Sequence, residues 1–385
     1  MEQYLNQSVK NIEISGIRKF FNLVQGKKDM VSLTIGQPDF QTPEHIKEAT
    51  KKAIDQNFTT YTPNAGVPEL RNAVSQYVNK RFQLDYNPED EVIITVGASQ
   101  AIDITLRTII QPGDEVLLPG PVYPGYEPLI KLAGGTPVYV DTRDHQFKFT
   151  ADLIQQHLTE RTKCVILPYP SNPTGVSLTH DELKDIAELL NDQPIFILAD
   201  EIYSELTYEK PHVSIGTFEE VKKQTLIVQG VSKSHSMTGF RIGFLLGDSE
   251  VMKHVLKVHQ YNVSCATSTS QYAALEAMQN GLEDPKHMRE FYLQRRDYVL
   301  SRLNQMGVDV VEPDGAFYVF PKLTPSNQTS FDFGLTLVDQ AKLALVPGDA
   351  FSSYGQGYMR ISYAYHEDVL KMGLDRLEHF LNQSQ

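Results

Sequence analysis

A lysine and an arginine able to do covalent and anion-binding chemistry share one polar segment, 229–241. Lys233 and Arg241 stand there among serines, a threonine and two glycines, directly after the apolar run 225–228. A lysine in a polar loop is usually a solvated surface charge. Beyond a buried strand, however, Lys233 is a candidate for a Schiff base with a carbonyl compound, and Arg241 is a candidate for binding an anion beside it.

A carboxylate and a phenol follow a second apolar run, 195–199. Asp200 comes directly after this run, and Tyr203 comes three residues later. An aspartate at such a place is typical of a helix cap or of a solvated loop. The functional alternative is a buried carboxylate that faces a cationic ring nitrogen, with the Tyr203 hydroxyl projecting from the same turn. Asn172 follows a third run among turn-forming residues, which also have a structural use.

Two further segments offer sites for anions. Ala98, Ser99 and Gln100 open a predicted helix after Gly97, where free N–H groups and the positive end of the helix dipole favour a phosphate. A helix that starts after a glycine is ordinary, so this signal is weak by itself. Arg360 lies between apolar residues in a predicted strand, and its planar guanidinium matches a carboxylate. The structural alternative is a surface arginine on an edge strand.

These residues follow elements that alternate in the pattern of βαβ units. Short apolar runs alternate with helix-like segments from about residue 91 to residue 246, which predicts a mainly parallel sheet covered on both faces. The runs are 92–96, 115–118, 137–140, 164–167, 195–199, 225–228 and 242–246. Ligands of such sheets bind beyond the carboxyl ends of the strands, where the candidate residues lie.

The periodicity predicts helices within the sheet region and a smaller α+β region after it. Helices are expected over 99–110 and 179–190, where Thr179 and Glu182 form a capping box. A long helix over 285–306 leads to the second region. Strands are predicted there over 308–311, 316–320 and 358–362, and helices over 331–342 and 366–381.

The composition excludes several classes of function. Lys and Arg number 35 against 48 Asp and Glu, a net charge of −13, so the chain has no basic surplus for nucleic acid or an anionic membrane. No apolar stretch approaches the roughly 20 residues that span a bilayer. The two cysteines and the scattered histidines match neither a disulfide framework nor a metal site. We expect a cytoplasmic protein.

Five motifs, in this order along the chain, resemble those of the class I/II aminotransferases, which are fold type I enzymes that use pyridoxal 5′-phosphate (PLP). The motifs are Tyr61-Thr62-Pro63-x-x-Gly66, Ser171-Asn172-Pro173-Thr174-Gly175, Asp200-x-x-Tyr203, Ser232-Lys233 and Arg360. The resemblance runs from about Ile14 to the C-terminus. It implies an α/β fold with an N-terminal arm and part of the small domain in 1–50, a large PLP-binding domain in 51–285 and a small domain in 286–385.

The resemblance implies a role around the cofactor ring for each matching position. Lys233 would form the Schiff base and move a proton as base and then acid. Asp200 would keep the pyridine nitrogen protonated, so that the cofactor acts as an electron sink. Asn172 and Tyr203 would bind the phenolic oxygen, and Tyr123 would stack on the ring. The pKa of Lys233 should be lowered by cationic neighbours and partial burial.

The phosphate and the substrate have their own implied residues. Ser232, Arg241 and the helix start at Ala98, Ser99 and Gln100 would hold the phosphate. Tyr61 would reach the phosphate of the neighbouring subunit, which implies a homodimer with shared sites. The substrate α-carboxylate would bind Arg360, with help from Gly36 and Asn172. Ile17 and Arg18 would be lid residues of the N-terminal arm.

Two departures from the family pattern concern the cofactor. Many relatives have tryptophan at the stacking position, but this chain contains none, so Tyr123 must supply the ring face. Gly230 stands three residues before the lysine, where some members carry a phosphate-binding serine. The phosphate site would then have one hydroxyl fewer.

The implied reaction is a ping-pong transfer of an amino group from an amino acid to a 2-oxo acid, with 2-oxoglutarate as the expected acceptor. A serine hydrolase is disfavoured because Gly97-Ala98-Ser99-Gln100-Ala101 lacks the last glycine of Gly-x-Ser-x-Gly. An NAD dehydrogenase is disfavoured because Gly-x-Gly-x-x-Gly is absent. A non-catalytic PLP-binding regulator would keep the fold and the lysine, so it stays an alternative.

Four stretches resemble the subgroup of N-acetyl-LL-2,6-diaminopimelate aminotransferases, which act in lysine biosynthesis. They are 14–20, 169–173, 232–239 and 259–266. Aspartate, aromatic and broad-specificity aminotransferases share the same machinery, and their selectivity depends on the shape of the side-chain pocket. The amino donor therefore stays open between this subgroup and those enzymes.

Overall fold

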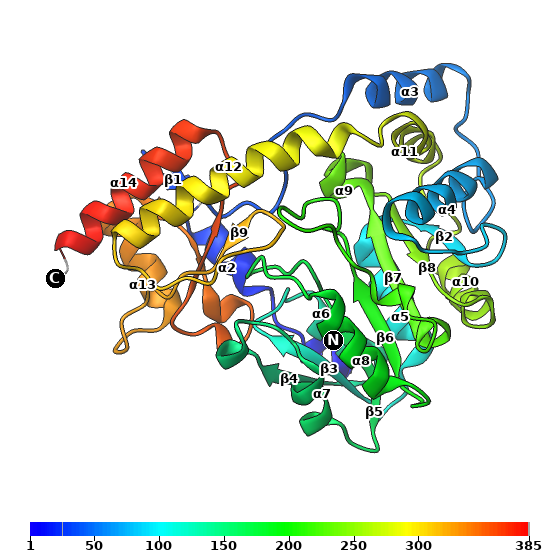
Figure 1. Ribbon diagram of the computed structural model, residues 1–385, viewed down its shortest axis with the longest axis horizontal. Coiled ribbons are helices and arrows are strands. Elements are labelled where there is room, and N and C mark those ends of the chain that lie inside the picture. The colour runs from blue at the N-terminus through cyan, green and yellow to red at the C-terminus, as the bar shows by residue number, and fades with distance from the viewer. Residues whose placement is uncertain (25, 384–385) are drawn as a thin grey trace.

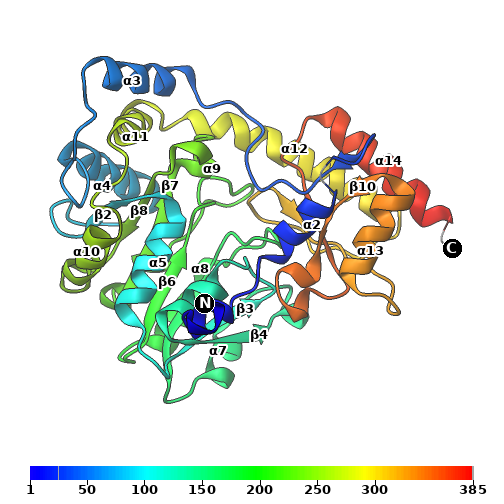
Figure 2. The ribbon, with the colours of Figure 1, turned by 180° about the vertical axis from the view of Figure 1, so that it is seen from behind.

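A seven-stranded sheet with helices on both faces forms the centre of the protein (Figure 1 and Figure 2). This computed structural model describes residues 1–24 and 26–383. In spatial order the strands are β2 (Val92–Thr95), β8 (Gly243–Leu246), β7 (Thr225–Gly230), β6 (Phe196–Asp200), β5 (Thr162–Leu167), β3 (Glu115–Gly120) and β4 (Thr136–Asp141). β8 runs in the opposite direction to the other six strands of this sheet, which are parallel to one another. The predicted mainly parallel sheet is confirmed, and each predicted run became one strand.

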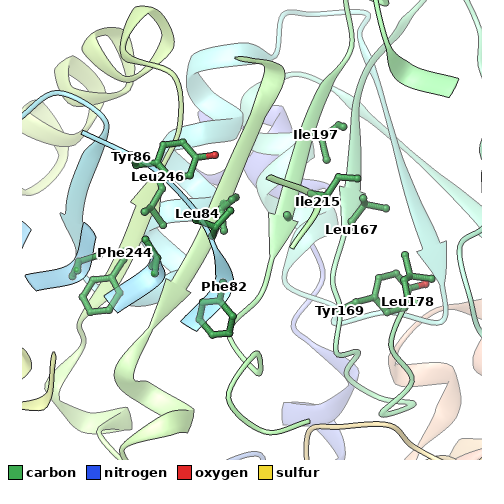
Figure 3. Packing of buried hydrophobic residues seen from close by; sticks show 14 of the residues in the cluster. Phe82, Leu84, Tyr86, Leu167, Tyr169, Leu178, Ile197, Ile215, Phe244 and Leu246 are labelled. Carbon is green, nitrogen blue, oxygen red and sulfur yellow. The ribbon is translucent and has the colours of Figure 1, made fainter. Parts of the chain in front are cut away.

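The strands are apolar on successive residues because both faces of the sheet are covered. In β5, Cys164 and Ile166 belong to the core on one face, with helices α5 (Gly97–Ile109) and α6 (Tyr126–Ala133). Val165 and Leu167 belong to the core on the other face, with helices α4 (Pro68–Phe82) and α8 (His180–Leu190). Figure 3 shows the second of these cores, in which Leu167 and Ile197 lie near Ile215. Covered in this way, the sheet holds its strand ends in fixed positions.

The two helices predicted within the sheet region are present, as α5 for 99–110 and α8 for 179–190. The α-helices are α1 (Gln7–Lys10), α2 (Gly16–Val24), α3 (Glu44–Asp55), α4 (Pro68–Phe82), α5 (Gly97–Ile109), α6 (Tyr126–Ala133), α7 (Ala151–His157), α8 (His180–Leu190), α9 (Val231–Ser234), α10 (Ser249–Val263), α11 (Ser268–Asn280), α12 (Asp284–Gln305), α13 (Ser330–Thr336) and α14 (Glu367–Gln383). The predicted capping box is present at α8, where Glu182 N donates to Thr179 Oγ1 at 3.3 Å and Thr179 N donates to Glu182 Oε2 at 2.7 Å.

A second region follows the sheet region and is joined to it by the long helix α12 (Figure 1). Its core lies between α12, α14 and a three-stranded antiparallel sheet. The short strands are β1 (Val31–Ser32), β9 (Tyr318–Val319), β10 (Leu343–Ala344), β11 (Val346–Pro347) and β12 (Met359–Ser362). β1 pairs with β10, so the N-terminal segment adds a strand to this region.

Three predictions for the second region were inaccurate. The predicted strand over 308–311 is wrong, because this segment pairs with no strand of the described residues. Its backbone bonds are those from Val308 N to Leu303 O and from Lys322 N to Asp309 O. The strands predicted over 316–320 and 358–362 shorten to β9 and β12. The helix predicted over 331–342 divides into α13 and a π-helical turn over 337–341. β-branched residues favoured strands locally, but a strand also needs a pairing partner.

No helix within residues 1–24 and 26–383 combines the length and the hydropathy that crossing a bilayer requires.

Candidate active site

A cavity of about 420 Å³ lies where β6 and β7 end, between the sheet region and the second region. Most residues predicted for the site line it together, although they come from segments far apart in the sequence. They are Ile17, Gly36, Ala98, Ser99, Tyr123, Asn172, Asp200, Tyr203, Ser232, Lys233, Arg241 and Arg360. The carboxyl-end rule for parallel strands explains why most of these positions meet at one edge of the sheet.

Three predicted residues do not line this cavity. The side chain of Gln100 turns back on the helix start, where its Oε1 accepts from Val96 N at 2.7 Å and its Nε2 donates to Asn262 Oδ1 at 2.9 Å. Tyr61 is 88% exposed, and Arg18 is also exposed. Gln100 still contributes its backbone to the helix start beside the cavity, whereas Tyr61 and Arg18 lie outside it.

Lys233 lies on the one-turn helix α9, directly after β7. Its Nζ donates to Gly36 O at 2.7 Å and stands 5.7 Å from the centre of the Tyr203 ring. Burial and the nearby charges of Arg360 and Arg241 lower the pKa of Lys233 to about 8, although Asp200 acts in the opposite direction. The amine is therefore far easier to deprotonate than that of an exposed lysine, as the sequence predicted.

Asp200 is the last residue of β6 and is buried. Its Oδ2 accepts from the Tyr126 hydroxyl at 2.7 Å, and its Oδ1 accepts from Ile202 N at 3.3 Å. Burial raises the pKa of Asp200, while the bonds from Tyr126 and Ile202 and the charge of Lys233 lower it. A cation in the cavity would favour the ionised carboxylate further.

Arg360 carries an unpaired charge into the cavity from β12. Its Nη1 donates to Asn172 Oδ1 at 2.9 Å, and its Nη2 donates to Thr34 O at 2.6 Å. The side chain is 2% exposed, and its Nε has no hydrogen-bond partner. No carboxylate of the described residues pairs with this guanidinium. A buried cation without an anion is costly, so the arrangement suits an anionic ligand.

A second cationic group lies against the start of α5. No side chain caps this helix, which begins at Gly97 in a left-handed conformation with φ +75°. A Cβ on Gly97 would stand 2.4 Å from Arg241 Nη2, so only glycine allows the guanidinium this close. Arg241 Nη1 also donates to Thr238 O at 2.9 Å. Uncapped N–H groups beside an arginine are chemically suited to a phosphate.

The structure gives a physical reason for Gly230. A Cβ at this position would lie 2.9 Å from Ile242 O and 3.0 Å from the Cα of Gly243, because β7 and β8 pair closely at this point. A serine would therefore not fit without a shift of the backbone.

Several residues of the cavity were not predicted from the sequence. Tyr126 is the first residue of α6, and its ring lies edge-on to that of Tyr123, which precedes the helix, so no helical spacing indicated it. Tyr318 lies in a predicted strand, but nothing in the sequence indicated which face it occupies. Thr34 and Thr238 accept hydrogen bonds through backbone carbonyls, so their side-chain types carry no signal.

Comparisons with known proteins agree on one family. A family model described as aminotransferase class I and II matches residues 28–377. The "Probable N-acetyl-LL-diaminopimelate aminotransferase" of Bacillus subtilis (strain 168) is 60% identical over 381 residues, which cover 99% of this chain and 96% of that protein. The aspartate aminotransferase of Pyrococcus abyssi (strain GE5 / Orsay) is 39% identical over 375 residues, 96% of each protein.

Solved structures show the same relationship. The aspartate aminotransferase of Thermus thermophilus with maleate has a TM-score of 0.92 at 35% identity, with 97% of this chain and 99% of that chain covered. The aromatic aminotransferase from Pyrococcus horikoshii OT3 has a TM-score of 0.90 at 36% identity, with 96% and 99% covered. These similarities favour a transaminase over a hydrolase, a dehydrogenase or a non-catalytic regulator. The chain belongs to the class I and II aminotransferase family and is a transaminase, which transfers an amino group between an amino acid and a 2-oxo acid.

Proposed function

We propose that this transaminase binds PLP in the cavity and holds it through a Schiff base to Lys233. One observation carries the proposal: Lys233, Asp200 and Arg241, from three separate segments, line the same cavity. They offer an amine of lowered pKa, a buried carboxylate and a cation at an uncapped helix start. These groups suit an aldehyde, a ring nitrogen and a phosphate, which are the three functional parts of PLP.

The residues around the ring would control its electronic state. When bound, PLP withdraws the electrons left on the substrate α-carbon after deprotonation. The Asp200 carboxylate would hold a proton on the pyridine nitrogen, and Tyr126 orients that carboxylate through a 2.7 Å hydrogen bond. The Oδ1 of Asn172 accepts from Arg360, so its amide N–H groups are available for the phenolic oxygen of the ring.

Lys233 would move the proton at the substrate α-carbon. In the first half-reaction its Nζ removes the proton from the α-carbon of the amino donor. In the second half-reaction it delivers a proton to the α-carbon of the 2-oxo acid. A pKa of about 8 leaves both forms of the amine populated near neutral pH, as a group that acts as base and then as acid requires.

Arg360 would bind the substrate α-carboxylate with the edge of the guanidinium that faces the cavity. The group is already oriented by Asn172 and Thr34, so little side-chain freedom is lost on binding. Gly36 presents its backbone beside Lys233, and Ile17 lines the same cavity. Only its position in the N-terminal arm supports a lid role for Arg18. Unchanged kcat/KM values for all substrates in Arg18→Ala would remove it from the proposal.

The amino donor that we propose is N-acetyl-LL-2,6-diaminopimelate, with 2-oxoglutarate as the acceptor, which would make the chain an enzyme of lysine biosynthesis. The name of the Bacillus subtilis relative at 60% identity supports this choice. The second candidate is an aspartate or aromatic amino acid, because relatives at 39% and 38% identity carry those names.

Two measurements test the proposal. Borohydride reduction of the cofactor-loaded protein, followed by peptide mapping, should label Lys233. Mixing the loaded protein with single donors, namely N-acetyl-LL-2,6-diaminopimelate, glutamate, aspartate and phenylalanine, should remove the visible absorbance fastest with the acetylated diamine and glutamate. Labelling elsewhere would refute the cofactor assignment. Rapid loss with aspartate or phenylalanine, and none with the acetylated diamine, would refute the donor.

We further propose that Tyr61 completes the phosphate site of a second copy in a homodimer. Its 88% exposure leaves the phenol available to a partner. Complementation tests this arrangement: Tyr61→Ala and Lys233→Ala should each be nearly inactive. A refolded mixture of the two should regain activity, because each mixed dimer combines an intact Lys233 with an intact Tyr61. A mixture that stays inactive, although mixed dimers form, would refute the shared site.

A further inference from the structure

Tyr318 connects two residues that have separate roles in the proposed function. It lies on β9, lines the cavity and is fully buried. Its hydroxyl lies 2.9 Å from the hydroxyl of Tyr203. The guanidinium carbon of Arg360 lies 4.4 Å from the centre of its ring. One side chain thus contacts both the phenol expected at the cofactor and the cation expected at the substrate.

Either hydroxyl could donate in the contact between Tyr203 and Tyr318, and the proton count limits what each direction allows. Burial raises the pKa of both Tyr203 and Tyr318, so each keeps its proton near neutral pH. Only one of the two protons can lie between the oxygens. Among the described residues, Tyr203 is the only hydrogen-bond partner of the Tyr318 hydroxyl. If Tyr318 donates, it uses this proton and leaves the Tyr203 proton free to point to a cavity ligand. If Tyr203 donates its proton to the cofactor, as the proposed function requires, Tyr318 must be the donor in this contact.

The ring contact follows from the pairing of β9 with β12. Tyr318 is opposite Ser362 in the antiparallel register, and Arg360 is two residues from Ser362, on the same face of the strand. The aromatic face of Tyr318 therefore supports the guanidinium from one side. Phe351, whose ring centre is 5.2 Å away, provides a second aromatic contact. Cation–π contacts leave the N–H edge of an arginine free for a carboxylate.

We propose that Tyr318 is a positioning residue that directs the Tyr203 proton toward the cofactor and holds Arg360 in place for the substrate carboxylate. This inference rests on the proposed function and extends it to a residue that no motif indicated. The two contacts use different parts of the side chain, namely the hydroxyl and the ring. They can therefore be removed one at a time.

Tyr318→Phe removes the hydroxyl and keeps the ring. The pH midpoint at which the visible spectrum of the loaded protein changes should shift in the same direction as in Tyr203→Phe. The shift should be smaller than in Tyr203→Phe and correspond to at most about a fivefold change in proton affinity. The double variant should shift no further than Tyr203→Phe alone, because Tyr318 acts through Tyr203. The affinity for 2-oxoglutarate, measured by calorimetry, should stay within about a factor of two, because the ring contact remains.

Tyr318→Leu removes the ring as well. The affinity for 2-oxoglutarate should fall about three- to thirtyfold, and the KM for the amino donor should rise in parallel. Tyr318→Met gives the same comparison with a longer side chain if the leucine variant does not fold. Tyr363→Phe is the matched control, because Tyr363 is also fully buried and its hydroxyl also lies 2.9 Å from that of a second tyrosine, Tyr208. Tyr363 does not line the cavity, so neither readout should change.

Equal spectral midpoints in Tyr318→Phe and Tyr363→Phe would overturn the first half of the proposal. An unchanged 2-oxoglutarate affinity in the folded leucine or methionine variant would overturn the second. A lower melting temperature without either change would mean a purely structural tyrosine. Failure of the proposed function is distinguishable, because the unsubstituted protein would then show neither a visible spectrum nor borohydride labelling of Lys233.

Discussion

The lowered pKa of Lys233 predicts how cofactor uptake should depend on pH. Only the unprotonated amine attacks an aldehyde. With a pKa of about 8, the free amine at pH 7 is about one molecule in eleven, against about one in 3,000 for a lysine at 10.5. The uptake rate of the cofactor-free protein should therefore rise about tenfold per pH unit below pH 8 and level off above it.

The cause of the shift can be tested with Arg360→Gln. The positive charge of Arg360 lowers the pKa of Lys233, so its removal should raise that pKa and move the uptake curve to higher pH. The direct measurement is stopped-flow absorbance with added PLP from about pH 6 to about pH 10, across both reference values. Arg107→Gln is the control, because Arg107 pairs with Asp103 on the same helix and does not line the cavity.

Two results would refute this reasoning. One is a wild-type rate that still rises tenfold per unit near pH 10, which would mean that burial leaves the amine as basic as an exposed lysine. The other is an uptake curve that Arg360→Gln and Arg107→Gln leave in the same place. In that case the charge of Arg360 would not act on Lys233.

Three further predictions concern the anion site, the carboxylate and the scaffold. Gly97→Ala should weaken PLP binding about ten- to a hundredfold in equilibrium dialysis, because a Cβ displaces Arg241 from the helix start. Gly239→Ala should leave PLP binding unchanged, because a Cβ there meets no atom within 4 Å. Equal losses of PLP affinity in the two variants would contradict the proposed phosphate site. Tyr126→Phe should raise the pKa of Asp200, so the loss of kcat/KM on acidification should begin about one pH unit higher. An acidic side of the pH profile of kcat/KM that does not move would contradict the role of Tyr126. Thr179→Ala should lower the free energy of unfolding by about 1 kcal/mol in urea titrations, because the α8 cap is lost. Since α8 lies outside the cavity, a lower kcat in that variant would show a link to the site that the structure does not contain.

The sheet region could be predicted from the sequence because local and tertiary signals agree there. Each strand is covered on both faces, so its burial is visible as an unbroken apolar run, and the loops that follow were the correct places to look for the site. Asp200 and Lys233 were found by this rule. Arg241 was found by its distance from Lys233 and by resemblance, because it precedes a strand instead of following one.

The second region was harder to predict because its strands are only two to four residues long. Such strands depend on neighbours distant in the sequence, and a local alternation like that of 308–311 does not show whether a neighbour exists. The contact of Tyr318 with Tyr203 joins the second region to the loop after β6, and its contact with Arg360 joins two short paired strands, so no local pattern indicates either contact. The π-helical turn after α13 also has no clear signal in the sequence.

The reversed strand β8 limits how this protein can vary. Because β7 and β8 are antiparallel and Gly230 pairs with Gly243, the connection 231–242 leaves the sheet and returns to it at the same edge. Lys233 and Arg241 are therefore fixed relative to each other by a single short loop. An insertion or deletion there would change the separation of the two side chains directly, whereas loops at the opposite end of the strands carry neither residue. Natural length variation among relatives should accordingly avoid 231–242.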